Sequence, residues 1–289
     1  MTKRTRIQNY EKMIKEGRGA GIGNEYVPWL KIQDVPSLGR ATRLKGIKTG
    51  RQHEFLSDME RNYFYILEYS DSVIDIREQF PLLPLEETIL IANELGINHP
   101  KHPETGEFIV MTTDFLLTVD AEDKMLERAR TIKAKDDLLD KRVIEKFEIE
   151  RVYWSKKGID WGIVTEEEID KAIAHNISYV HGYKDISNLD CFIDIATNEI
   201  KDLIYEFLKR IVDDERPMRV ICSEFDNEML LGKGSGLSIF KYLVINKVIE
   251  IDIKKRINVN QNIPIINVRE EEARKVEVIW LLLTQYLNI

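Results

Sequence analysis

The chain has 289 residues, enough for two domains that each bury an ordinary hydrophobic core. It contains no apolar run that could span a bilayer and no apolar region of a signal peptide near its first residue, so we expect a cytoplasmic protein without a membrane partner. Its two cysteines, Cys191 and Cys222, lack the spacing of metal ligands, which excludes a cysteine-based zinc site and fits a reducing compartment.

Charge is distributed unevenly along the chain. The formal net charge is −8, yet residues 1–51 contain 12 Lys and Arg against 4 Asp and Glu. Such a segment is either a solvated basic tail or an arm that contacts phosphates, because clustered Lys and Arg release counterions on binding. The glycines around Arg18 do not follow a predicted strand, so they favour a phosphate-contacting or flexible loop over a dinucleotide motif. The candidate phosphate contacts are Arg18, Arg40, Arg43, Lys45, Lys48 and Arg51.

The first half of the chain has the pattern of an α/β domain. Residues 57–69 predict an amphipathic helix, and Ser57 followed by Glu60 fits a capping box at its start. In that interpretation Glu60 is a surface cap without chemistry. The remaining predicted elements are strands near 73–80, 107–119 and 126–133 with an insertion over 84–106, a helix near 137–157 and a strand at 161–165. This order indicates a layered α/β arrangement.

Beyond about residue 170 the pattern changes to short helices. Helices are predicted near 196–212, 223–231, 237–247 and 269–287, with a strand at 248–253. A helix, a turn and a second helix followed by a β ribbon suggest a winged helix. The would-be recognition helix, 237–247, carries only Lys241 and Lys247 and is otherwise largely apolar. We therefore favour a protein-binding or structural role for this domain over DNA reading.

A candidate active site comes from two of the predicted strands. Asp114 lies in one strand, and Lys133 ends the next, so that a hairpin would bring a carboxylate and an ammonium together. An acid, a short gap and acid-x-Lys form the core of many metal-dependent nucleases. Thr131 stands where the second acid would be expected. Ile132, between Thr131 and Lys133, is predicted to point into the core. The alternatives are an Asp that caps a turn and a solvent-facing strand Lys.

Several stretches in a fixed order resemble one family. They are Gly17-Arg-Gly-Ala-Gly, Tyr26-Val-Pro-Trp-Leu, Asp34-Val-Pro-Ser with Gly39-Arg40, Leu56-Ser-Asp-Met-Glu60, the segment from Ile74 to Pro84, Thr112-Thr-Asp-Phe and the segment from Glu145 to Trp154. Together they resemble TnsA, the endonuclease subunit of heteromeric cut-and-paste transposons. The resemblance spans residues 17–170 and is faint beyond.

The resemblance implies a fold and a set of site residues. Residues 1–170 would form a type II restriction-endonuclease-like domain with a basic arm, and residues 171–289 a winged-helix-like domain that binds partners. Its catalytic residues would be Glu60, Asp114 and Lys133, and Glu150 would lie behind them unless it is a solvated helix carboxylate. The metal ligands would be Glu60, Asp114, the backbone carbonyl of Ile132 and, in place of a family Gln, Thr131. Thr131 is shorter than Gln, so a water could fill its place.

The resemblance also implies an activity. This activity is cleavage of the 5′ ends of a transposon. It would depend on two Mg²⁺ ions per site, and Mn²⁺ would substitute for Mg²⁺. The partners would be double-stranded DNA, a TnsB-like transposase and a TnsC-like ATPase, and the protein would associate with the bacterial nucleoid when bound to DNA. The alternatives are a stand-alone nuclease of restriction or repair type and a catalytically inactive assembly factor.

Overall fold

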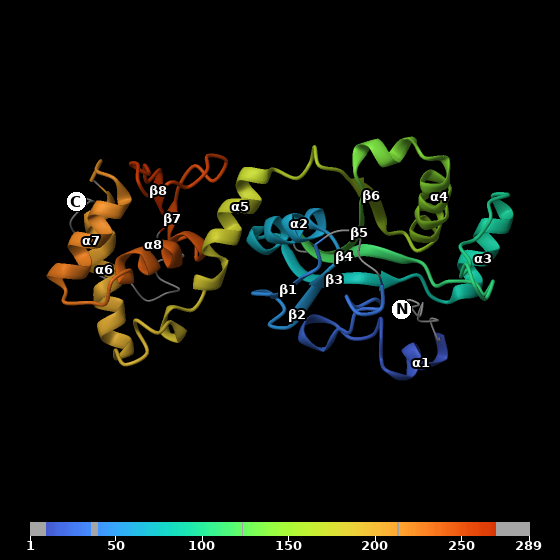
Figure 1. Cartoon of the computed structure of the whole chain (residues 1–289), viewed down its shortest axis with the longest axis horizontal. Coiled ribbons are helices and arrows are strands. Elements are labelled where there is room, and N and C mark those ends of the chain that lie inside the picture. Colours follow the sequence, from blue (N-terminus) through green and yellow to red (C-terminus); the bar gives the residue numbers. More distant parts are fainter. Residues whose placement is uncertain (1–9, 36–39, 123, 213, 270–289) are drawn as a thin grey trace, which may run out of the picture. The chain divides into compact units, whose positions relative to one another are not determined.

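The computed structural model of the chain describes residues 10–35, 40–122, 124–212 and 214–269 (Figure 1). It divides into two compact units, Met1–Asp170 and Lys171–Ile289, at the point where the sequence pattern changes. The helix predicted over 269–287 lies, apart from its first residue, outside the described residues. No helix in the described ranges is both long and apolar enough to cross a membrane.

A four-stranded mixed sheet is the centre of the first unit (Figure 1). The first three strands pair antiparallel, and the fourth lies parallel to the third, because η2 and α4 carry the chain back between them. The strands in sheet order are β3 (Val73–Pro81), β4 (Thr112–Ala121), β5 (Lys124–Ile132) and β6 (Asp160–Val164), and the crossover consists of η2 (Lys135–Leu139) and α4 (Lys141–Lys156). The predicted α/β class with a mixed sheet between helices is therefore confirmed.

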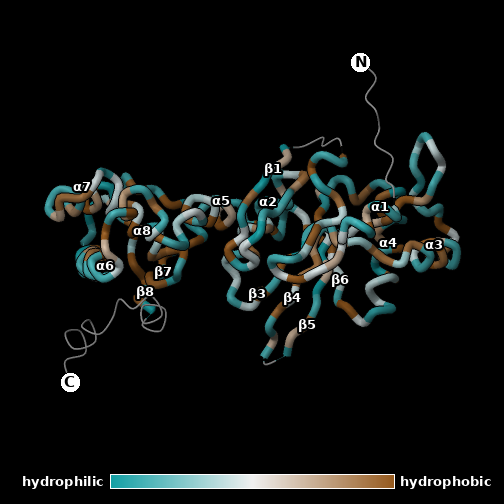
Figure 2. The backbone as a smooth tube through the Cα atoms, turned by 90° about the horizontal axis from the view of Figure 1, so that it is seen from below, coloured by the Kyte–Doolittle hydropathy of each residue, from teal (hydrophilic) through white to brown (hydrophobic). Residues whose placement is uncertain are grey.

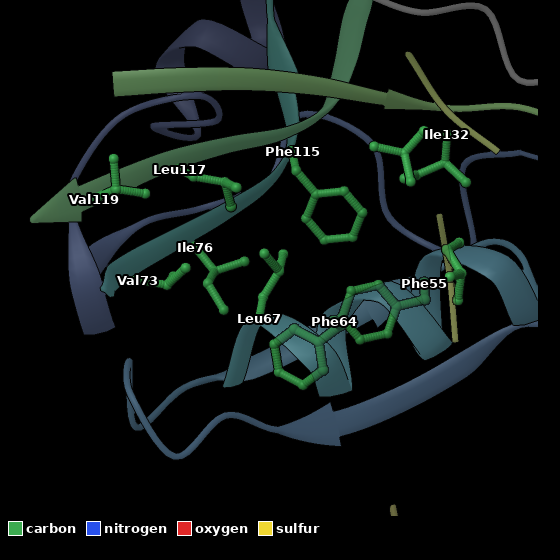
Figure 3. Packing of buried hydrophobic residues seen from close by; sticks show 11 residues of the cluster. Phe55, Phe64, Leu67, Val73, Ile76, Phe115, Leu117, Val119 and Ile132 are labelled. Atoms are coloured by element: carbon green, nitrogen blue, oxygen red, sulfur yellow. The ribbon is translucent and has the colours of Figure 1, made fainter. Parts of the chain in front are cut away.

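Both faces of this sheet are buried, which explains the continuous apolar run Phe115-Leu-Leu117 in β4. Successive strand side chains point to opposite faces. Phe115 and Leu117 pack with Phe64 of helix α2 (Asp58–Tyr69), as Figure 3 shows. Leu116 packs on the other face with Trp154 of α4, in the cluster that also includes residues of α3 (Leu85–Glu94).

The sequence did not predict several smaller elements of this unit. The expected insertion over 84–106 contains helix α3, and the basic segment forms a short hairpin of its own. These elements are α1 (Tyr10–Lys15), η1 (Gly23–Glu25), β1 (Thr42–Lys45) and β2 (Gln52–Phe55). Their short lengths give too few periods for an amphipathic pattern to appear.

The second unit is mainly helical. Figure 2 shows both hydrophilic and hydrophobic stretches along the chain of this unit, and the apolar residues of α6 are buried in the unit's core. Its elements are α5 (Lys171–Val180), η3 (His181–Tyr183), η4 (Ile186–Asn188), α6 (Thr197–Val212), α7 (Met218–Glu228), α8 (Ser235–Ile245) and the paired strands β7 (Ile249–Glu250) and β8 (Asn267–Val268).

Helix α8, which would be the recognition helix of a winged helix, is enclosed by the unit. Nine of its 11 residues are buried. Even Lys241 is buried, with Nζ 3.9 Å from the ring centre of Tyr179 and 4.3 Å from that of Tyr183. A helix buried on nearly all sides has no polar face to offer to a DNA groove. The apolar sequence of α8 is thus explained by its place in the core.

Candidate active site

The carboxylate of Asp114 is held by two N–H donors at the end of the mixed sheet. Regular pairing between β4 and β5 ends at Phe115 and Arg130, and Asp114 is the residue of β4 next to Phe115. The N–H of Ile132 donates instead to Oδ2 of Asp114 at 2.6 Å, and the side-chain amide of Gln79 donates to Oδ1 at 3.1 Å. The predicted hairpin therefore forms and places Asp114 beside the backbone of Ile132. Ile132 itself points into the core, as predicted.

Glu60 enters the site from the first turn of α2. The Ser57 hydroxyl accepts from the N–H of Glu60 at 3.1 Å and donates to its Oε1 at 2.8 Å, while the N–H of Leu56 donates to Oε2 at 3.1 Å. Ser57 is therefore the N-cap, as predicted, while the returning bond of the capping box comes from the N–H of Leu56 instead of that of Ser57. The expectation of a surface position is wrong, because Glu60 is only 7% exposed.

Glu60 and Asp114 share one electrostatic environment. Burial and then the charge of Asp114 raise the pKa of Glu60 to about 7. Burial raises the pKa of Asp114 to about 6, against hydrogen bonds from Ile132 and Gln79 and the charge of Lys133. A cation near these two carboxylates would stabilise the charged form of both. Raised pKa values of neighbouring acids are common at catalytic and metal-binding sites.

Lys133 follows β5 directly and remains partly exposed. Its ammonium lies 3.0 Å from Oδ2 of Asp137, in the 3₁₀ turn η2, and its charge also lowers the pKa of Asp114. The structure thus brings Lys133 into the field of Asp114, as the sequence predicts. Its direct partner is Asp137.

Glu150 and Thr131 form a second, buried network beside the first. Oε1 of Glu150 accepts from the hydroxyls of Thr113 and Thr131, each at 2.5 Å, and Trp161 donates to Thr131 at 3.1 Å. Glu150 is 2% exposed, which excludes the solvated helix carboxylate. Burial raises its pKa to about 7, and the charge of Asp114 adds to this rise. The Thr131 hydroxyl is thus directed to Glu150 in this structure, which does not favour it as a metal ligand.

Sequence reasoning did not identify Gln79. This side chain is 2% exposed and contacts Asp114 directly, and its hydrogen bonding also lowers the pKa of Glu60. The available signal was Arg77-Glu78-Gln79, a polar run inside a strand that is otherwise predicted to be buried. Periodicity alone does not show which of these polar side chains faces a catalytic acid.

The six basic residues expected to contact phosphates have different environments. Arg51 is buried, and its Nη1 donates to Glu78 at 2.8 Å, so its side chain is committed to the fold and leaves no surface for phosphate. Arg18 is similarly engaged with Asp34 at 2.5 Å. Lys48 donates to the carbonyl of Ser70 at 2.7 Å. The remaining three, Arg40, Arg43 and Lys45, are exposed, and the last two belong to β1. Arg43 also donates to Oε1 of Glu54 at 3.0 Å.

The residues present fit a hard divalent cation. Mg²⁺ commonly uses one or two carboxylates and keeps several waters. Glu60 and Asp114 supply two carboxylates, and the Ile132 backbone lies beside the second. Within the described residues, no group of three His, Cys, Asp or Glu side chains is arranged to hold a metal ion. The site therefore fits a partly hydrated ion and does not fit a closed structural metal centre.

An α/β domain that gathers paired carboxyl groups and a lysine at one end of its sheet has the make-up of a nuclease. Residues 70–166 match the N-terminal domain of TnsA-like endonucleases, and residues 168–253 match the C-terminal domain of TnsA endonucleases. The transposition protein TnsA of transposon Tn7 from Escherichia coli is 39% identical over 256 residues, which cover 86% of this chain and 88% of that protein. The chain belongs to the TnsA endonuclease family, as its motifs predict, and is an endonuclease of transposition.

Proposed function

We propose that the protein is a Mg²⁺-dependent DNA endonuclease that cuts the 5′ ends of a transposon. The observation that carries this proposal is the Glu60–Asp114 pair, two acids whose pKa values are raised to about 7 and about 6 in a shared environment. A mixed sheet with helices on both faces also supports the expected likeness to type II restriction endonucleases. The winged-helix likeness of the second unit stays a prediction.

The residues of the site divide the chemical work. Glu60, Asp114 and the carbonyl of Ile132 would hold two Mg²⁺ ions, with Mn²⁺ as a substitute. When bound, such ions supply charge stabilisation to the scissile phosphate and activate water. Lys133 is proposed to orient the attacking water or to stabilise the negative charge that develops on the phosphate. In this role the Lys133 ammonium would leave its ion pair with Asp137 and pair with the phosphate, which is also an anion.

The DNA surface that we propose begins at the exposed basic face of β1. Arg43 and Lys45 alternate there with less exposed residues, and Arg40 precedes the strand. These side chains would contact phosphates, which position the duplex without reading its sequence.

We further propose that a TnsB-like transposase and a TnsC-like ATPase are partners, with the ATPase on the second unit. Exposed apolar side chains there support a protein-binding role. Leu230, in the turn between α7 and α8, is 92% exposed, and Ile193 is 67% exposed. Such exposed apolar side chains are available for contact with a partner protein.

The proposal is tested by cleavage of transposon-end DNA with Mg²⁺, with and without the TnsB-like transposase. Asp114→Asn removes the central carboxylate, so we expect a loss of at least about 100-fold, since the affected charge stabilisation is worth several kcal/mol. The matched control is Asp120→Asn, the same change at an exposed position of the same strand, which should cleave like the unaltered protein.

The possible outcomes separate the alternatives. Full cleavage without the transposase would identify a stand-alone nuclease. Absence of cleavage by the unaltered protein under both conditions would identify an inactive assembly factor. Equal cleavage by Asp114→Asn and Asp120→Asn would refute the assigned site.

A further inference from the structure

Gln79 has a backbone conformation that its residue type rarely adopts. It lies in β3 with φ of 49°, in the left-handed region, although it is not a glycine. A side chain in this region carries a steric cost and persists only where surrounding contacts determine the conformation. Such residues are concentrated at active sites, which makes Gln79 a candidate for a functional role.

Contacts from the N-terminal segment hold this part of the backbone. The N–H of Trp29 donates to the carbonyl of Gln79 at 3.2 Å, and the hydroxyl of Tyr26 donates to the carbonyl of Glu78 at 3.0 Å. Trp29 is fully buried and Tyr26 is 3% exposed, so both donors are themselves fixed by packing. The segment that contains these two aromatic residues therefore helps to hold the backbone at Gln79.

Thr112 and Asp114 orient the side-chain amide of Gln79. The Thr112 hydroxyl donates to Oε1 at 3.1 Å, and the amide nitrogen donates to Oδ1 of Asp114 at the same distance. A rotated amide would place its oxygen against the carboxylate oxygen of Asp114, two acceptors without a proton between them. Thr112 thus donates to Gln79, and Gln79 donates in turn to Asp114.

These hydrogen bonds leave the Asp114 carboxylate capable of binding a cation. Each carboxylate oxygen has two acceptor positions, and one donor occupies a position on each, Gln79 on Oδ1 and the Ile132 N–H on Oδ2. The second position on each oxygen can serve an ion while both donors stay in place. Carboxylates that hold ions in proteins usually accept such supporting hydrogen bonds, and loss of a supporting partner typically weakens metal binding about 10- to 100-fold.

We propose that Gln79 is a positioning residue that, through its amide, fixes the Asp114 carboxylate opposite Glu60 for a divalent cation. This inference rests on the proposed Mg²⁺ dependence. Thr112 is the residue that sets the direction of the Gln79 amide.

The test compares Gln79→Ala with Gln79→Gly in the full chain. Both variants remove the amide, but only glycine also relieves the left-handed backbone. We expect both to bind Mn²⁺ about 10- to 100-fold more weakly by isothermal titration calorimetry and to cleave transposon-end DNA with a lower kcat. Gln79→Gly should melt at a higher temperature than Gln79→Ala. Similar losses of Mn²⁺ binding and kcat in the two variants would then not be explained by their different stabilities.

A second pair of variants leaves Gln79 unchanged. Thr112→Val removes the hydroxyl that orients the amide and should weaken Mn²⁺ binding. Thr112→Ser keeps a hydroxyl at this position and should bind Mn²⁺ like the unaltered protein. This pair decides the question if the Gln79 variants do not fold.

The outcomes are distinguishable. Unaltered protein that binds neither Mn²⁺ nor Mg²⁺ would overturn the proposed metal dependence, and the positioning role with it. Metal binding that is the same in the unaltered protein and in the Gln79 and Thr112 variants would overturn the positioning role alone. Normal Mn²⁺ binding in Gln79→Gly together with weak binding in Gln79→Ala would also overturn it, because the backbone and not the amide would then be responsible.

Discussion

At the scale of residues, the site depends on acids that are costly to ionise where they lie. Glu60, Asp114 and Glu150 come from α2, β4 and α4, and burial is the largest cause of the raised pKa in each. Hydrogen bonds from Ser57, Gln79 and the Ile132 N–H only partly offset this cost. A cation bound between Glu60 and Asp114 would therefore recover part of the stability that the burial of these acids costs.

This cost gives the protein a pH-dependent stability in metal-free buffer. The folded state keeps protons on these acids up to about pH 6–7, whereas the unfolded chain releases them near their ordinary pKa. Since the unfolded state then binds fewer protons, the free energy of unfolding should fall as pH rises from about 4 to about 7. Glu60→Gln should make this fall shallower, as measured by urea denaturation at several pH values. The exposed control Glu86→Gln, in the first turn of α3, should leave the slope unchanged, and an equal slope for both variants would contradict the assignment.

At the scale of elements, short polar contacts hold segments that have little regular structure. In the second unit, the loop after β7 is attached to helix α5 by one side chain. The Asn176 amide donates to the carbonyls of Ile253 and Lys255 at 2.8 and 2.9 Å and accepts from the N–H of Ile257 at 2.9 Å. The Asn176 side chain is fully buried, so the fold commits it to these three contacts.

Loss of this side chain should destabilise the second unit. Asn176→Ala leaves two carbonyls and one N–H without their partner, and we expect a cost of about 2–4 kcal/mol in the free energy of unfolding. The measurement is chemical denaturation of the full chain. Asn198→Ala, at an exposed position of α6, is the matched control and should change stability by less than about 0.5 kcal/mol. A similar small change for Asn176→Ala would show that the loop does not depend on this contact.

At the scale of the whole molecule, each of the two compact units buries hydrophobic residues of its own. Phe64 is fully buried against the mixed sheet of the first, and Phe225 is fully buried beside Phe207 in the second, with ring centres 5.1 Å apart. The division at Asp170 and Lys171 therefore separates two sets of packing interactions.

Each core should respond to its own mutation. Phe64→Ala and Phe225→Ala each remove a fully buried ring, at an expected cost of about 3–5 kcal/mol. In scanning calorimetry we expect the first to lower the transition of the sheet unit and the second to lower that of the helical unit. If either substitution lowered both transitions equally, the units would unfold as one cooperative body.

The sequence alone determined the class of fold, the strand pair that carries Asp114 and Lys133, the N-cap at Ser57 and the family. These depend on local periodicity and on motifs whose residues lie close together in the chain. Only the tertiary structure decided that Glu60 is buried beside Asp114, that Arg51 is committed to Glu78, and that α8 is a core helix. It also directed Thr131 to Glu150 and Gln79 to Asp114, contacts between residues 19 and 35 positions apart. The physical reason is that burial and hydrogen-bond partners are fixed by packing between distant elements, which the local pattern of a strand does not encode.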